Sequence, residues 1–134
     1  RTSTTGGSQT RFENGDNFII YQFISIYGHS KFGHYEGNGN ANGTFVYTGF
    51  SPALVMLKSI DSTSDWEMYD NVRAGYNVDN NQLEANDEAA QDTGTFIDLL
   101  SNGFKMRASG DPNVAESYLY AAWAHNSLKY ATAV

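Results

Sequence analysis

Residues 95–107 read Thr-Phe-Ile-Asp-Leu-Leu-Ser-Asn-Gly-Phe-Lys-Met-Arg, two short apolar runs separated by Ser101-Asn102-Gly103. Asn-Gly is the strongest short hairpin signal, because both residues tolerate the positive φ angles that a tight hairpin turn requires. We therefore predict that Thr95–Leu100 and Phe104–Arg107 are two antiparallel strands of one hairpin.

Further strands are predicted on the N-terminal side of this hairpin. Ala53–Ile60 is apolar at its start and amphipathic at its end, as in a partly buried strand. Gly49-Phe-Ser-Pro52 separates it from a strand at Thr44–Thr48, because proline lacks the N–H that a strand ladder needs. Phe32–Tyr35 is interpreted as an extension of the apolar strand pattern that begins at Phe18, and a short strand is expected at Trp66–Arg73. The segments between them are rich in Gly, Asn, Ser and Asp and are predicted to be turns: 36–43 and 61–65.

Two segments near the ends of the chain are harder to assign. Phe18–Ile26 is aromatic and β-branched over nine positions and apolar on both faces, which indicates a central strand. Glu116–His125 suits a strand by its aromatic spacing, but its alanines favour a helix. Because it weakly repeats the pattern of Asp16–Ser25, we interpret it as a strand as well.

The predicted fold is all-β, an antiparallel β-sandwich or jelly roll. Residues 74–94 are rich in Asn, Asp, Glu and Ala and are expected to form a long surface loop, with a short helix over Leu83–Gln91 as an alternative for part of it. The alternative to the whole fold is an α+β arrangement with a C-terminal helix. Residues 1–15 are polar and predicted to be a flexible arm or linker, and residues 16–134 a single β-sandwich domain.

Composition excludes several classes of partner. The 134 residues carry a net charge of −7, and the eight Lys and Arg residues are scattered, which argues against nucleic-acid binding and against an anionic membrane surface. There is no cysteine to supply a disulfide or a zinc ligand. No apolar run approaches the roughly 20 residues that span a bilayer, so membrane insertion is not expected. The start, Arg1-Thr2, is neither a Met nor a signal peptide, and we expect a processed product or a piece of a longer chain.

A catalytic site is not predicted. No Gly-x-Ser-x-Gly elbow is present. His29, His34 and His125 are interpreted as surface or core-edge residues, and the spacing of His29 and His34 would place them on opposite faces of a strand. We therefore expect a protein that is not an enzyme and has no cofactor.

A few residues are candidates for a structural or binding role. Asp70 and Arg73 are predicted to form a partly buried, hydrogen-bonded pair that fixes a loop. Tyr35, Trp66 and Tyr76 are candidate contacts to a glycan or to a protein partner, although such aromatics more often belong to a core or an interface. The weak Ca²⁺ candidates match no EF-hand loop, so a solvated acidic loop is the preferred interpretation: Asp79, Asp87 and Glu88.

Several spaced motifs resemble a module found in phage and marine-virus proteins. They are Gly-Asn-Gly at 37–39, Gly-Phe-x-Pro-x-x-Val-x-x-Lys at 49–58, Tyr-Asp-Asn-x-Arg at 69–73, and Ser-Asn-Gly-Phe-Lys at 101–105. The ending Tyr-x-x-x-Ala-Trp-Ala also matches, although His125 stands where the family usually has an acid. The resemblance covers about residues 17–130. It implies a virion protein, often part of a tail fibre, without established catalytic residues.

The leading functional hypothesis is therefore a structural or adhesive protein of a bacteriophage particle surface, a tail-fibre module or a capsid decoration. Its expected partners are other virion proteins and further copies of itself in a homo-oligomer, bound through aromatic and aliphatic strand faces. The alternative is a carbohydrate-binding module that recognises host surface glycans. A polysaccharide hydrolase has the least support.

Overall fold

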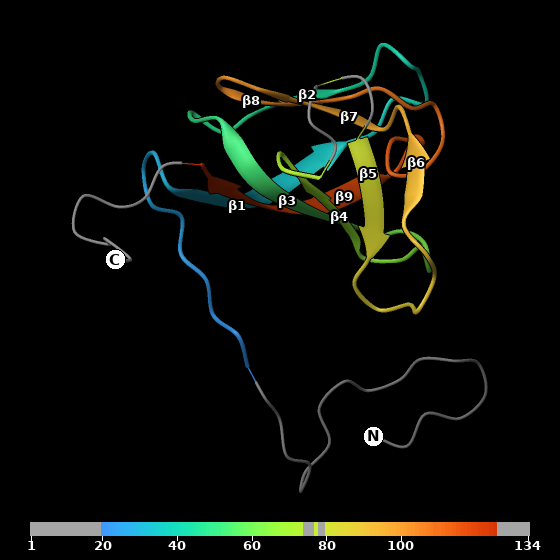
Figure 1. Ribbon diagram of the computed structural model, residues 1–134, viewed down its shortest axis with the longest axis horizontal. Helices are drawn as coiled ribbons and strands as arrows, with labels where there is room; N and C mark the ends of the chain where they lie inside the picture. Colours follow the sequence, from blue (N-terminus) through green and yellow to red (C-terminus); the bar gives the residue numbers. More distant parts are fainter. Residues whose placement is uncertain (1–19, 74–76, 78–79, 126–134) are drawn as a thin grey trace, which may run out of the picture.

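The computed structural model describes residues 20–73, 77 and 80–125. Two antiparallel sheets face each other across one core, with the smaller sheet above the larger in Figure 1. The described residues form strands and turns without a helix, and therefore none that could span a membrane. The predicted all-β sandwich is confirmed. The α+β alternative is wrong, because Ser117–Ala124, where its C-terminal helix would lie, is a strand.

The larger sheet has six strands and the smaller sheet has three. The order in the larger sheet is β1-β9-β3-β4-β5-β6 and in the smaller sheet β2-β8-β7. The strands of the larger sheet are β1 (Ser30–Glu36), β9 (Ser117–Ala124), β3 (Pro52–Ser59), β4 (Glu67–Asp70), β5 (Asn80–Glu84) and β6 (Asp92–Gly94). Those of the smaller sheet are β2 (Phe45–Tyr47), β8 (Gly103–Met106) and β7 (Ile97–Leu100).

The predicted hairpin is present as β7 and β8. Leu100 pairs with Gly103, so the turn itself consists of Ser101 and Asn102. Gly103 is also constrained by its neighbour in the sheet, because a Cβ there would lie 2.1 Å from the carbonyl oxygen of Val46. A glycine at this position therefore allows β2 to approach β8 closely.

The core lies between the sheets and is mostly aromatic. The rings of Tyr35 and Tyr118 stack with centroids 5.1 Å apart, and Phe104 meets Tyr35 and Tyr120 edge to face at 6.0 and 5.6 Å. The Tyr35 hydroxyl donates a hydrogen bond to the carbonyl of Pro112 at 2.6 Å, which satisfies its buried polar end. These rings connect β1 and β9 to β8 of the opposite sheet.

The prediction of a central strand at Phe18–Ile26 is wrong for the described part of that segment. Residues 20–25 lie outside any strand, and Ile26 forms only an isolated bridge with Ser30. The central positions of the larger sheet belong to β3 and β4 instead. Residues 16–19, and with them part of the proposed internal repeat, lie outside the described residues.

The prediction of a long surface loop over residues 74–94 is wrong in part. β5 and β6 lie within it and pair through Asn80–Gly94, Asn81–Thr93 and Gln82–Asp92. Strands at the margin of a sheet bury few side chains, and backbone hydrogen bonds hold them without an apolar pattern. The alternative helix over Leu83–Gln91 is not formed, because Leu83 is in β5 and the residues after Glu84 form a turn and extended backbone.

Candidate binding surface

The outer face of the larger sheet, which points away from the core, carries a row of apolar side chains. Cross-strand register aligns one residue from each of five adjacent strands, all partly buried: Phe32, Ala121, Met56, Met68 and Leu83. Because side chains alternate along a strand, their neighbours Val55 and Tyr69 point inward and are fully buried. The larger sheet is therefore apolar on both faces.

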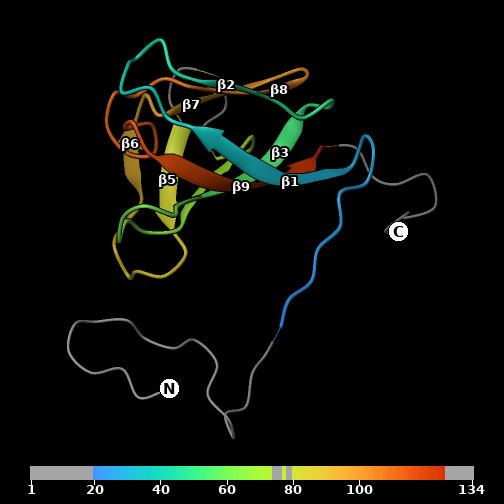
Figure 2. The same ribbon diagram turned by 180° about the vertical axis from the view of Figure 1, so that it is seen from behind.

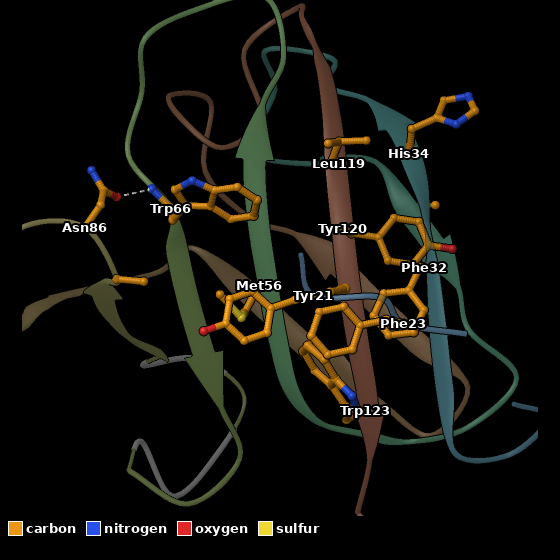
Figure 3. A pocket seen from close by; sticks show the side chains of 13 residues that line it. Tyr21, Phe23, Phe32, His34, Met56, Trp66, Asn86, Leu119, Tyr120 and Trp123 are labelled. Carbon is orange, nitrogen blue, oxygen red and sulfur yellow. Dashed lines mark hydrogen bonds between the residues drawn. The ribbon is translucent and has the colours of Figure 1, made fainter. Parts of the chain in front are cut away.

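A groove of about 850 Å³ runs over this face. Figure 3 shows Trp66 and Asn86 on one side of the groove, Met56 on its floor, and Phe32, Phe23 and Trp123 on the other side. Other lining residues come from the same strands and from the segment before β1: Tyr21, Gly33, His34, Ala85, Leu119, Tyr120 and Ala121. We call this feature the outer groove.

An aromatic cluster forms one wall of the outer groove. The ring of Phe23 stacks on Phe32 with centroids 5.4 Å apart, and Trp123 meets both rings edge to face at 5.9 and 5.5 Å. Such pairs contribute roughly 0.5–1.5 kcal/mol each beyond the area they bury. The cluster fixes Phe23, which precedes β1, against the sheet.

The opposite wall depends on Trp66, the residue before β4. Its backbone N–H donates to Asn86 Oδ1 at 2.7 Å, and Asn86 Nδ2 donates to Asp65 Oδ1 at 2.7 Å. The Trp66 side chain remains 41% exposed. Both polar atoms of the Asn86 amide are thus hydrogen-bonded within the chain. This wall therefore offers a ligand the large apolar ring of Trp66 and few free polar groups.

The three predicted contact residues are not brought together. Trp66 lines the outer groove. Tyr35 is only 6% exposed and belongs to the core, so its interpretation as a glycan or partner contact is wrong. Tyr76 lies outside the described residues. In the structure Tyr35 lies on the inner face of β1. The sequence indicated a strand here but did not indicate which of its two faces would be the inner one.

Asp70 and Arg73 lie at the end of β4 and form an ion pair. Asp70 Oδ1 also accepts the backbone N–H groups of Val72 and Arg73, both at 2.9 Å, and Arg73 Nη1 donates to Gln91 Oε1 at 3.0 Å. Partial burial opposes ionisation of Asp70, but the hydrogen bonds from Arg73 and Val72 outweigh it and lower its pKa. The pair thus holds the turn after β4.

Among the described residues, three carboxylates converge beside the outer groove. Oxygens of Asp65, Glu84 and Asp87 lie within 4.8 Å of one another, close enough to hold a cation in principle. Of the weak Ca²⁺ candidates, only Asp87 belongs to this group. Glu88 is exposed and outside it, and Asp79 lies outside the described residues.

A buried carboxyl lies on the inner side of the same sheet. Glu67 is 4% exposed, and the Tyr69 hydroxyl lies 3.1 Å from Glu67 Oε2 and 2.7 Å from Gln82 Oε1. Burial, reinforced by the charge of Asp111, raises the pKa of Glu67 to about 8. It faces the core and not the outer groove, so we assign it a role in stability.

The groove residues Phe23, Phe32, Met56 and Trp123 were not predicted as a site. Each was assigned to a predicted strand without a role in a site. Applying period-two alternation to both faces of each predicted strand would have marked Phe32, Met56 and Trp123 as outward and apolar. Their alignment into one row depends on the pairing of β1 and β3 with β9, which local sequence does not specify.

A family model described as a domain of unknown function, DUF7483, matches residues 1–127. No curated protein and no solved structure shows significant similarity to the chain. Since the family model spans most of its length, the chain belongs to the DUF7483 family.

Proposed function

We propose that this member of the DUF7483 family is a structural or adhesive protein of a bacteriophage particle surface, a tail-fibre module or a capsid decoration. In this proposal the outer groove is a surface for protein–protein contacts within the particle, to another virion protein or to a further copy of the chain. The observation that carries the binding role is the apolar row that crosses five strands of the outer face. The virion setting is supported by the resemblance of the motifs at 37–39, 49–58, 69–73 and 101–105 to phage modules.

The composition of the groove favours a protein partner. Large apolar patches on a protein surface mark interaction sites, and interface cores are enriched in Trp, Tyr, Phe and Met and depleted of charge. The outer groove contains both tryptophans of the chain together with Phe23, Phe32 and Met56. A partner that covers this face would remove these side chains from water, at about 25 cal/mol for each Å² of apolar surface.

A charge placed in the groove tests this function in the particle. Leu119 lines the groove on β9 and points outward, so Leu119→Glu would put a carboxylate into the covered face. We expect its incorporation into particles, measured by quantitative mass spectrometry, to fall at least about tenfold. Val72→Glu is the matched control, because Val72 is an exposed apolar residue in the turn after β4 and should incorporate normally. Equal incorporation of both variants, each folded by circular dichroism, would contradict the proposal.

A glycan ligand is the second candidate, and the exposed Trp66 ring favours it. An open indole face suits stacking on the apolar face of a sugar ring. If the groove binds glycans, the chain should bind members of a glycan array and the Trp66→Ala variant should lose that binding. The groove offers few free polar groups to orient hydroxyls, since Asn86 is already bonded to Trp66 and Asp65. For this reason we rank the protein partner first.

A further inference from the structure

The segment Ile20–Tyr27, which we call the docking segment, is apolar and exposed. It reads Ile-Tyr-Gln-Phe-Ile-Ser-Ile-Tyr, and within it Ile20, Tyr21, Ile24 and Tyr27 are 79%, 78%, 73% and 100% exposed. Together with Phe23 and Ile26, these side chains present a surface on the order of 800 Å², close to what each partner contributes to a standard interface. β-branched and aromatic residues in this pattern favour a strand.

Strand β1, next to the docking segment, has a free edge. It is the terminal strand of the larger sheet. The N–H of Ala124 donates to the carbonyl of His29, and the N–H of Gly37 donates to the carbonyl of Glu116, so the odd-numbered residues of β1 bond to β9. The backbone groups of the even-numbered residues therefore point away from β9. Ser30 bonds to Ile26, the Phe32 N–H to Ser25 Oγ and the Glu36 carbonyl to Thr44 Oγ1, so the open part of this edge is the Phe32 carbonyl and the N–H and carbonyl of His34. Such an edge is a template for a further strand.

The docking segment does not fill this edge within its own chain. A hairpin begins with the bridge between Ile26 and Ser30 but stops there. The N–H of Phe32 donates to Ser25 Oγ at 3.1 Å, and Ser30 Oγ donates to the carbonyl of Ile24 at 2.9 Å. These side-chain bonds replace the next backbone pairs. Phe23 still stacks on Phe32, and the backbone of the segment runs away from the sheet, as the blue trace shows in Figure 2.

We propose that the docking segment of one copy adds as a strand to the β1 edge of a second copy of this chain, with its aromatic side chains over the outer groove of that copy. A second copy is favoured because the chain carries both complementary surfaces: an apolar segment with strand-like sequence that is largely exposed, and an edge beside an apolar groove that is open around His34. The inference rests on the binding role of the outer groove and adds the identity of the partner.

Oligomeric state is the first test. Sedimentation equilibrium of the full chain should show concentration-dependent self-association that strengthens with salt, because each copy carries a net charge of −7 and salt screens the repulsion. Ile24→Glu should weaken association at least about tenfold, and Val72→Glu, which changes an exposed residue elsewhere, should leave it unchanged. A monomeric wild-type chain, or association equally strong in Ile24→Glu, would overturn the proposal. Neither result would decide the proposed function, because the Leu119→Glu experiment tests incorporation into particles separately.

A cross-link between copies tests the geometry. The chain has no cysteine, so Ile24→Cys in one preparation and His34→Cys, with a mass tag, in another introduce one thiol each. After mixing and mild oxidation, we expect a tagged–untagged disulfide dimer to exceed the yield from a control mixture of Val72→Cys and tagged His34→Cys at least about fivefold. Equal yields in both mixtures would show that the docking segment does not reach β1 of another copy. If only added particle proteins shift the sedimentation of the chain, the partner is a different virion protein and the self-association proposal is wrong.

Discussion

The Glu67→Gln variant is expected to be more stable than the wild-type chain by about 3 kcal/mol at pH 8.5 and by less than about 1 kcal/mol at pH 5. Glu67 is buried in the core, and its pKa is raised from 4.5 to about 8. The folded state thus holds the proton over a pH range in which the unfolded state has already released it.

The direction of the pH dependence follows from this difference. Between pH 4.5 and about 8 the native state binds more protons than the unfolded state, so the free energy of unfolding falls as pH rises through this window. The contribution of protonated Glu67 to the free energy of unfolding is fully present below pH 4.5 and is lost above about pH 8. The amide that replaces the carboxyl in the variant is neutral at every pH, so the variant does not undergo this loss.

A hydrogen bond from the Tyr69 hydroxyl to Glu67 Oε2 would lower the pKa of Glu67, but burial outweighs it. The Tyr69 hydroxyl has one proton and lies closer to Gln82 Oε1, at 2.7 Å, than to Glu67 Oε2, at 3.1 Å. If Tyr69 donates to Gln82, only a protonated Glu67 can donate to the Tyr69 oxygen and complete the chain. An ionised Glu67 would share a single donor with Gln82 in a buried site, which is unfavourable.

Urea unfolding at pH 5, 7 and 8.5 measures the effect, with Glu88→Gln as the control. Glu88 is exposed, so its replacement should leave the pH dependence of stability unchanged. A Glu67→Gln variant that gains no stability relative to wild type between pH 5 and 8.5 would show that Glu67 is ionised at neutral pH in the folded chain.

Asn113→Ala is expected to destabilise the fold by about 3 kcal/mol, because Asn113 is fully buried and its amide joins two loops. Its Nδ2 donates to the oxygens of Asn38, Asn40 and Ala108 at 2.8–3.0 Å, and its Oδ1 accepts the N–H of Asn38 at 3.2 Å. Alanine would remove these hydrogen bonds and leave a gap where the fully buried Asn113 side chain lies, although Asn38 and Asn40 themselves are exposed. The loop at 37–44 would then be joined to the loop that precedes β9 by fewer hydrogen bonds, chiefly those from the N–H groups of Gly37 and Gly39 to the carbonyls of Glu116 and Asn113.

Thermal or urea unfolding at pH 5 measures this loss apart from the ionisation of Glu67. Asn71→Ala is the comparison, because Asn71 makes an exposed side-chain contact to His125 and should cost under about 1 kcal/mol. Similar losses in the two variants would mean that the loops around Asn113 are held by other contacts.

Local turn and strand chemistry predicted much of the fold. Asn102-Gly103 located the β7–β8 hairpin, Pro52 marked the boundary between β2 and β3, and the aromatic spacing of residues 116–125 indicated the strand β9. In each case the residues that specify the element lie within it or beside it. The interaction between Asp70 and Arg73 could likewise be predicted from the local sequence, because the two residues are three positions apart at one strand end.

Features that depend on distant partners were not predicted. The sequence of Phe18–Ile26 indicates a strand, but a strand forms only with a pairing partner. Residues 20–25 contact the β1 edge through side-chain hydrogen bonds and are not in a strand. β5 and β6 are polar and depend on pairing with each other and with β4. The apolar row on the outer face depends on the register of β1, β9, β3 and β4, which aligns Phe32, Ala121, Met56 and Met68, and the outer groove lies over the Phe32, Ala121 and Met56 part of this row.

Oxidative footprinting of the chain in intact particles, compared with the isolated chain at low concentration, tests the central claim that a protein covers the outer groove. The account predicts that Tyr21 and Trp66, which line the groove, lose most of their reactivity in the particle. Phe45, exposed on β2 of the smaller sheet, should keep its reactivity. If Tyr21 and Trp66 react in particles as they do in the isolated chain, the outer groove is not the assembly surface.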